Sequence, residues 1–167
     1  DAFIVLEDAD MGRAVKQAVS GRMGNAGQAC TASKRFIVLD AVADAFLDQF
    51  KAAMAQFKPG DPMDERSTLA PLSPADALDK LEKQVQTAVQ HGAKLLLGGK
   101  RVAGTDGNFM EPTLLTDIAE KNPMFNEEFF GPVAMFFRVP EEAAAGALAT
   151  DAPFGGGGSW SPGAGER

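Results

Sequence analysis

Apolar residues in this chain gather into short continuous runs, separated by segments in which they recur at helical spacing. Continuous runs are typical of strands that are buried on both faces of a sheet. They predict strands at 3–6, 36–39, 94–97 and 133–139, with a further extended segment at 109–115. Because the strands alternate with helices, the pattern predicts an α/β fold: a mostly parallel sheet with helices on both faces.

The helical segments carry their apolar residues on one side, every three or four positions. We expect helices over residues 11–21, 42–57, 74–91 and 141–149. Asp8 or Asp10 can cap the first helix, and Ser73 is expected to cap the third, with Pro74 at its first helical position. Gly92 then ends the third helix. The aromatic stripe of the second helix is interpreted as core packing.

Composition narrows the class of protein. The 167 residues are 45% hydrophobic and 23% charged, as in one ordinary globular domain with a proper core. The formal net charge of -7 argues against a nucleic-acid or anionic-membrane partner. One cysteine and one histidine allow neither an internal disulfide nor a structural zinc site. No apolar run approaches the roughly 20 residues that cross a bilayer, so we predict a cytoplasmic protein without a metal.

Cys30 is the only cysteine of the chain and lies in a loop of small residues just before the strand at 36–39. Small residues and glycine let a substrate approach a side chain closely. If a short helical turn follows Cys30, its free amides, with Lys34 and Arg35 nearby, favour the reactive thiolate. The alternative is a buried structural cysteine, since free cysteines are among the most buried residues. On the residues alone that alternative is favoured.

Several sequence segments, taken in order, favour the reactive cysteine over the buried structural one. Residues 25–38, around Cys30, resemble the active-site segment of the NAD(P)-dependent aldehyde dehydrogenases, and residues 126–133 resemble a second segment of that family. Further landmarks of the family follow its order and spacing at 3–10, 60–62, 92–99 and 111–115. The resemblance covers nearly the whole chain. It implies an incomplete catalytic domain of the family at residues 1–150, and a glycine-rich, altered or incomplete tail at 151–167.

The resemblance also implies a chemistry. Cys30 matches the nucleophile that forms a thiohemiacetal with an aldehyde, which becomes a thioester after hydride transfer to NAD or NADP and is then hydrolysed to the acid. The backbone amide of Cys30 would be one oxyanion donor. Glu128 matches the glutamate that hydrogen-bonds the nicotinamide ribose, and Phe130 the aromatic that packs near the nicotinamide ring. Without the resemblance, Glu128 would be one of two solvated acids and Phe130 a core residue.

Other parts of the family's machinery are expected outside the chain. The resemblance places the dinucleotide-binding domain, the general-base glutamate and an oxyanion asparagine upstream of Asp1. We therefore expect that this chain cannot turn over aldehyde unaided, and that the full-length protein is a homo-oligomer. Two alternatives stay open: a relative that passes the thioester to coenzyme A, and a non-catalytic fragment that keeps the fold for packing or assembly.

The resemblance implies a small-molecule aldehyde as the substrate. The middle of the chain most resembles bacterial succinate-semialdehyde dehydrogenases of the Sad type, which favours succinate semialdehyde. Many semialdehyde enzymes hold the substrate carboxylate with an arginine six positions before the nucleophile. That position is Gly24 here, and the nearest cation is Arg22; this departure argues against a substrate that carries a carboxylate. In the tail, Gly156 stands where the family has a core leucine.

Overall fold

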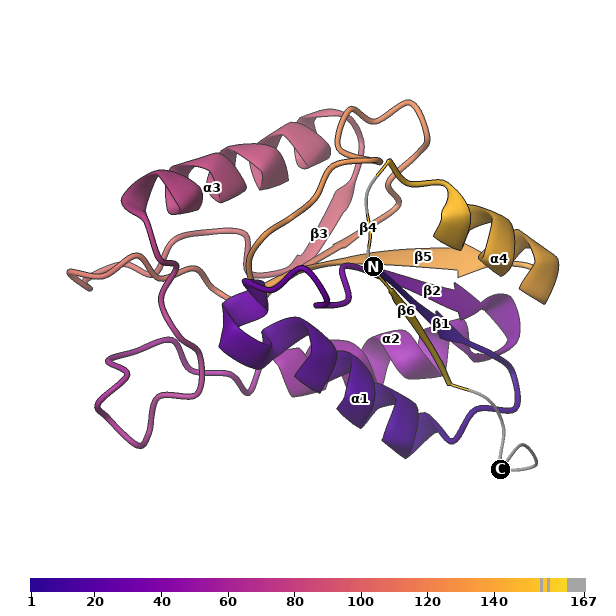
Figure 1. The fold of residues 1–167 in the computed structure, drawn as a ribbon, viewed down its shortest axis with the longest axis horizontal. Coiled ribbons are helices and arrows are strands. Elements are labelled where there is room, and N and C mark those ends of the chain that lie inside the picture. The colour runs from indigo at the N-terminus through magenta and orange to yellow at the C-terminus, as the bar shows by residue number, and fades with distance from the viewer. Residues whose placement is uncertain (154, 156, 162–167) are drawn as a thin grey trace.

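A six-stranded sheet forms the centre of the computed structural model, which describes residues 1–153, 155 and 157–161 (Figure 1). The strands lie in the order β3-β4-β5-β2-β1-β6, and every neighbouring pair is parallel except β3 and β4. The predicted α/β class and mostly parallel sheet are confirmed. The strands are β1 (Ala2–Val5), β2 (Arg35–Leu39), β3 (Lys94–Leu97), β4 (Thr113–Thr116), β5 (Val133–Val139) and β6 (Gly158–Ser161).

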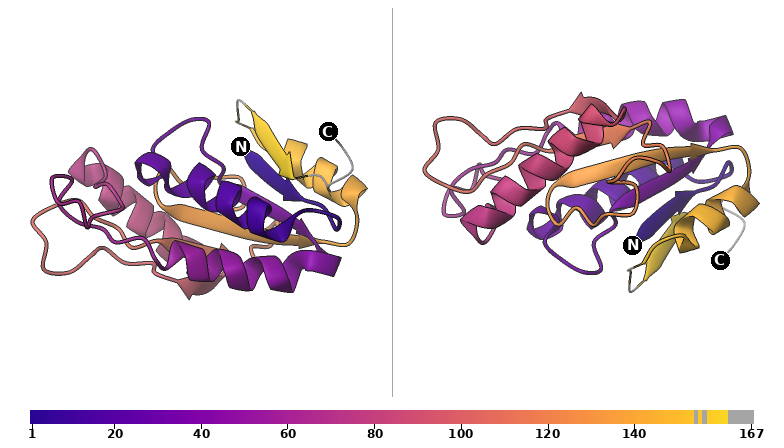
Figure 2. Two further views of the ribbon diagram at one scale, coloured as in Figure 1. Left: turned by 90° about the horizontal axis from the view of Figure 1, so that it is seen from below. Right: turned by 90° about the horizontal axis from the view of Figure 1, so that it is seen from above.

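Helices cover both faces of this sheet, as the sequence predicts. Figure 2 shows two of them on one face, α1 (Met11–Met23) and α2 (Asp40–Met54). The other two lie on the opposite face: α3 (Ala75–Gln90) and α4 (Glu142–Thr150). Asp10 caps α1, because its carboxylate accepts a hydrogen bond from the backbone N–H of Arg13 at 2.9 Å.

Aromatic side chains join α2 to the sheet. The ring of Phe50 lies 4.6 Å from that of Phe36 on β2 and 5.3 Å from that of Phe46, measured between ring centroids. The ring of Phe3 on β1 extends the group, 5.7 Å from Phe36. Phe36, Phe46 and Phe50 are fully buried. The aromatic stripe of this helix is therefore core, as predicted, and it fixes α2 against the strand that follows the Cys30 loop.

The start of α3 differs from the prediction. Its capping residue is Pro74, in an extended conformation (φ −96°, ψ 153°) and outside the helix, so the expected Ser73 cap is wrong. The backbone N–H of Ser73 instead donates to the side-chain oxygen of Gln28 at 2.8 Å. Ser73 thus makes a long-range hydrogen bond to Gln28 and does not cap the helix. Helical spacing in the sequence cannot reveal a long-range bond of this kind.

The strand at β3 forms where expected, but it is not buried on both faces. Lys94 and Leu95 are exposed, and β3 pairs only with β4, in antiparallel orientation, at the end of the sheet within the described residues. An edge strand has one neighbour and one open side, so part of its apolar run faces solvent. The prediction that residues 94–97 are buried on both faces is therefore wrong.

Part of the glycine-rich tail forms a strand. Strand β6 pairs in parallel with β1, with Ala2 opposite Gly158. Backbone pairing needs no side chains, so a glycine-rich segment can form a strand on the open edge of β1. Gly156, at the position of the expected leucine, lies outside the described residues.

Because β1, β2 and β5 are parallel, the segments that precede them lie together at the N-terminal ends of these strands. The backbone oxygen of Asp1 accepts hydrogen bonds from the N–H groups of Lys34 and Arg35, at 3.0 and 3.3 Å. The N–H of Met135 on β5 donates to the oxygen of Lys34 at 3.0 Å. The Cys30 loop precedes β2 and the residues around Glu128 precede β5, so this pairing sets them side by side.

Candidate active site

Cys30 is exposed in the loop between α1 and β2. The buried-cysteine alternative is therefore wrong. The loop around the thiol contains one hydrogen-bonded turn, in which the N–H of Ala32 donates to the oxygen of Ala29 at 3.2 Å. No helix follows Cys30 before β2 begins at Arg35. The expected stabilisation of a thiolate by a helix N-terminus is thus wrong.

A strained turn, η1 (Gly24–Gly27), delivers the chain from α1 to the thiol. Three consecutive residues have left-handed backbones: Asn25 (φ 50°), Ala26 (φ 52°) and Gly27 (φ 75°). This conformation costs roughly 1–2 kcal/mol for each non-glycine residue, so other contacts must hold it. Position 27 requires glycine on a second ground, because an added Cβ would lie 2.2 Å from the backbone oxygen of Gly131.

Gln28 ties the same loop to the segment that leads into α3. Its amide nitrogen donates to the backbone oxygens of Asn25 and Pro71, both at 3.1 Å, and its oxygen accepts from the N–H of Ser73 at 2.8 Å. Both amide protons and the oxygen of one side chain are therefore used. Gln28 has no direct role at the thiol in this arrangement; it fixes the position of the loop that carries Cys30.

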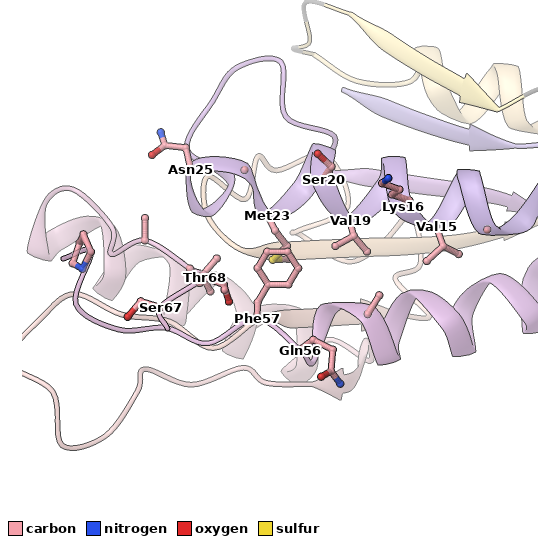
Figure 3. A pocket seen from close by; sticks show the side chains of 16 residues that line it. Val15, Lys16, Val19, Ser20, Met23, Asn25, Gln56, Phe57, Ser67 and Thr68 are labelled. Atoms are coloured by element: carbon pink, nitrogen blue, oxygen red, sulfur yellow. The ribbon is translucent and has the colours of Figure 1, made fainter. Parts of the chain in front are cut away.

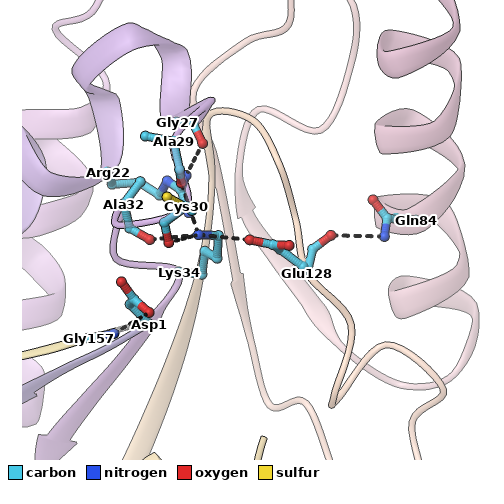
Figure 4. Close-up of polar contacts among 10 residues, drawn as sticks. All are labelled: Asp1, Arg22, Gly27, Ala29, Cys30, Ala32, Lys34, Gln84, Glu128 and Gly157. Atoms are coloured by element: carbon cyan, nitrogen blue, oxygen red, sulfur yellow. Dashed lines mark hydrogen bonds and ion pairs between the residues drawn. The ribbon is translucent and has the colours of Figure 1, made fainter. Parts of the chain in front are cut away.

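Lys34 lies inside the loop and is 1% exposed (Figure 4). Its ammonium donates to the backbone oxygens of Ala29 (3.1 Å), Cys30 (3.1 Å) and Ala32 (2.9 Å). It also forms an ion pair with Glu128, with 2.9 Å between Nζ and Oε1. Lys34 thus holds the backbone around the nucleophile and joins it to the predicted cofactor glutamate.

Arg35 does not serve the thiol, contrary to expectation. Its guanidinium donates to the backbone oxygens of Leu148 (2.8 Å), Ala149 (2.9 Å) and Asp151 (3.2 Å), at the end of α4. Burial lowers the pKa of Arg35, and the carboxylate of Asp151 acts in the opposite direction. Lys34 and Arg35 are neighbours in the chain, yet their side chains bind different parts of the molecule.

Glu128 and Phe130 lie in the segment before β5 and face the Cys30 loop. The side chain of Glu128 is 37% exposed and that of Phe130 is 45% exposed, whereas Phe129 is fully buried. The ring of Phe130 lies 6.0 Å from Nζ of Lys34, measured to the ring centroid. The backbone oxygen of Glu128 accepts from the side chain of Gln84 on α3 at 3.2 Å. The structure therefore brings Cys30, Glu128 and Phe130 together, with Lys34 between them.

Arg22 lies beneath the loop and is fully buried. Its Nη2 donates to the oxygen of Gly27 at 2.7 Å, while Nε and Nη1 have no hydrogen-bond partner among the described residues. Burial lowers the pKa of this guanidinium to about 10, and the carboxylate of Glu128 acts in the opposite direction. Because no part of Arg22 faces solvent, it does not replace the arginine that is missing at Gly24.

Sequence reasoning did not find the full roles of Lys34, Gln28 and Gln84. One usable signal was Gln84, a polar residue on the apolar stripe of α3 between Leu81 and Ala88, where a buried amide needs a partner. The links made by Gln28 join residues more than 40 positions apart. A contact of that kind leaves no periodic pattern in the chain.

A groove of about 850 Å³ lies between α1 and the segment that follows α2 (Figure 3). Its lining comes from α1, from the end of α2 at Ala53 and the residues Gln56 and Phe57 that follow this helix, and from residues 62 and 67–70; it reaches η1 at Gly24 and Asn25. Most of this lining is apolar. Cys30, Glu128 and Phe130 lie outside it, so the groove and the thiol are separate features of the surface.

The described part of the chain contains neither a membrane-spanning helix nor a metal-binding cluster. None of its helices combines the length and apolar character that spanning a membrane requires. No group of three or more His, Cys, Asp or Glu side chains there could hold a metal ion.

Comparison with known proteins identifies close relatives. The sequence model of the aldehyde dehydrogenase family matches residues 1–161. The chain is 46% identical, over 93% of its length, to succinate semialdehyde dehydrogenase [NAD(P)+] Sad of Escherichia coli, and 43% identical, over 95%, to succinate-semialdehyde dehydrogenase [NADP(+)] of Deinococcus radiodurans. It covers 33% of each of these proteins. The chain thus spans about a third of the length of the curated relatives it matches.

Solved structures agree with the sequence matches. The succinic semialdehyde dehydrogenase of Streptococcus pyogenes, determined in complex with NADP+, superposes with a TM-score of 0.92 at 42% identity. The match covers 96% of this chain and 35% of that protein.

Proposed function

The chain belongs to the aldehyde dehydrogenase family, and from this premise we propose that it is the nucleophile-bearing part of an enzyme that oxidises an aldehyde to a carboxylic acid with NAD or NADP. One observation carries the proposal. Cys30 is exposed, and its loop is joined through Lys34 to Glu128, which lies beside the exposed ring of Phe130.

In the proposed reaction the thiolate of Cys30 attacks the aldehyde carbon. A carbon–sulfur bond forms, and the carbonyl electron pair moves to oxygen, which gives a thiohemiacetal. The backbone N–H of Cys30 has no hydrogen-bond partner among the described residues, so it is free to donate to that oxygen. Its exposure leaves the thiol open to the substrate.

A bound nicotinamide would accept the hydride that leaves the substrate carbon, and Cys30 is then left as a thioester. Water hydrolyses the thioester, which releases the carboxylic acid and restores the thiol. In sum, aldehyde, water and oxidised cofactor give acid, reduced cofactor and a proton. We place the general base for the water, and the asparagine of the oxyanion site, outside these 167 residues, as the family resemblance implies.

The residues present fit a nicotinamide nucleotide. A carboxylate can accept hydrogen bonds from two sugar hydroxyls, and the side chain of Glu128 is exposed enough for a ribose to reach it. The exposed ring of Phe130 offers an apolar face beside it. These two residues would bind the ribose and the nicotinamide ring, and the rest of the dinucleotide would be held by a domain outside this chain.

We propose succinate semialdehyde as the aldehyde, on the strength of the names of the relatives. Gly24 offers no cation for its carboxylate, and the buried Arg22 offers none to solvent. If the proposal holds, the carboxylate is bound by residues outside the described part. A homo-oligomeric assembly and a cytoplasmic location are further proposals that rest on the family resemblance.

The test compares this chain with a longer polypeptide that also includes the proposed dinucleotide-binding domain and general base. Each is incubated with succinate semialdehyde, and separately with the uncharged aldehyde butanal, and formation of NADH or NADPH is followed. We expect turnover from the longer polypeptide, loss of that turnover in Cys30→Ser, and none from the 167 residues alone. Turnover that persists in Cys30→Ser would contradict the proposal.

The same assay separates the two alternatives. A reaction that requires coenzyme A, and that yields an acyl-coenzyme A in place of the acid, would identify a thiol-resolving relative. A longer polypeptide that produces no reduced cofactor with either aldehyde, although it folds and Cys30 is alkylated normally, would indicate a packing or assembly role.

A further inference from the structure

The ammonium of Lys34 has more acceptors than protons. Four oxygens lie within 3.1 Å of Nζ: one carboxylate oxygen of Glu128 and the backbone oxygens of Ala29, Cys30 and Ala32. An ammonium offers only three N–H donors, so the four oxygens must share them. The bonds to the nucleophile loop therefore depend on how much of this capacity Glu128 takes.

Solvent cannot relieve this competition, because Lys34 is 1% exposed. Arg22 is a second cation in the field of Glu128, whose charge raises the pKa of the guanidinium against the effect of burial. Burial lowers the pKa of the Asp1 amino group to about 6, so this group is mostly uncharged at pH 7. Glu128 thus supplies negative charge to a largely buried cationic group beneath the thiol. A change at Glu128 alters both the hydrogen bonds and the electrostatic field at the Cys30 loop.

We infer that Lys34 is a positioning residue that couples the carboxylate of Glu128 to the loop of Cys30. The inference rests on the proposed function, in which the ribose of the cofactor takes up Glu128. A ligand that draws Glu128 away then leaves the ammonium to the three loop oxygens and changes the reactivity of the thiol. Coupling of this kind is reciprocal, so modification of Cys30 also changes the affinity of the Glu128 site.

The test uses this chain without cofactor and imitates the loss of the carboxylate charge with Glu128→Gln. The rate of Cys30 alkylation by iodoacetamide is measured at pH 7. We expect alkylation at least about threefold faster than in the unchanged chain, because the cations beside the thiol then favour the thiolate. Glu127→Gln is the matched control, since Glu127 is exposed and its carboxylate has no partner among the described residues; its rate should stay unchanged.

Variants at Lys34 show whether the effect passes through this residue. In a Lys34→Met background, Glu128→Gln should leave the alkylation rate unchanged, whereas a Lys34→Arg background, which keeps the positive charge, should restore the effect. If Lys34→Met does not fold, Lys34→Gln takes its place, because its amide can still donate to two loop oxygens.

Three results would overturn the inference. One is an equal rate in Glu128→Gln and Glu127→Gln, and another is a Glu128→Gln effect that survives the loss of the lysine charge. The third is an effect that persists at about pH 10, where free thiols are ionised and only a change in access would remain. A thiol that reacts in no folded form, the unchanged chain included, would instead contradict the proposed role of Cys30.

Discussion

Gln28→Met tests whether one side chain positions the nucleophile loop. The substitution keeps the length of the side chain and removes its three hydrogen bonds, to the oxygens of Asn25 and Pro71 and from the N–H of Ser73. Each such bond contributes about 1 kcal/mol to stability. The bond to Asn25 and that from Ser73 are exposed, so water can replace part of what is lost.

We therefore expect Gln28→Met to lower the free energy of unfolding by about 2 kcal/mol. For a chain of this size that corresponds to a fall in Tm of roughly 4–8 °C. Urea unfolding followed by circular dichroism measures the stability, and hydrogen exchange of the Ser73 amide should accelerate, because that N–H loses its acceptor.

Gln17→Met is the matched control. Gln17 is exposed on α1 and its side chain makes no hydrogen bond within the described residues, so its replacement should change stability by less than about 0.5 kcal/mol. A Gln28→Met variant that is no more destabilised than Gln17→Met would show that Gln28 does not hold the loop. A fall in stability with exchange at Ser73 as slow as in the unchanged chain would contradict the role given to the Ser73 hydrogen bond.

Three further substitutions probe the loop, the core and the surface. Gly27→Ala should lower the free energy of unfolding by at least about 2 kcal/mol, because φ is 75° and the added Cβ meets backbone, whereas Gly24→Ala, with nothing within 4 Å of its Cβ, should have little effect in the same urea titration. Phe50→Ala should cost about 3–5 kcal/mol of unfolding free energy, since the ring is fully buried; a loss below 1 kcal/mol would contradict the packing. The guanidinium of Arg101 binds the carboxylate of Glu82 and lowers its pKa. The stability that this pair contributes is therefore present above the unfolded pKa of Glu82 and is lost as pH falls through its folded pKa. Arg101→Met should lower the stability measured in thermal melts at pH 7, and its difference from the unchanged chain should shrink below about pH 4.

Periodicity predicts the elements of this fold well, because each of them buries a local pattern. The stripe that contains Phe46 and Phe50 was interpreted as core, and both side chains are fully buried. Burial of a whole strand is less predictable. Leu95 belongs to a run as apolar as that of β2, yet it is 40% exposed, because the number of neighbouring strands is a property of the completed sheet.

The site residues that lie in family-like sequence segments could be predicted. Cys30, Glu128 and Phe130 were predicted from the resemblance to a family, and all three lie at the N-terminal ends of the central strands. The connection between them did not follow, because the partners of Lys34 are mostly backbone oxygens, which have no residue signature. The cap expected at Ser73 failed for a similar reason, since its N–H bonds a side chain 45 positions away.

Cys30 is proposed to be an accessible nucleophile beside the residues that would bind the cofactor. Intact mass after treatment of the folded protein with a limiting amount of a thiol reagent tests it most directly, with Cys30→Ser as the control. We expect one adduct on the folded chain at neutral pH and none on the variant. An adduct that forms only after the chain is unfolded would show that the thiol is buried and would contradict the proposed role of Cys30.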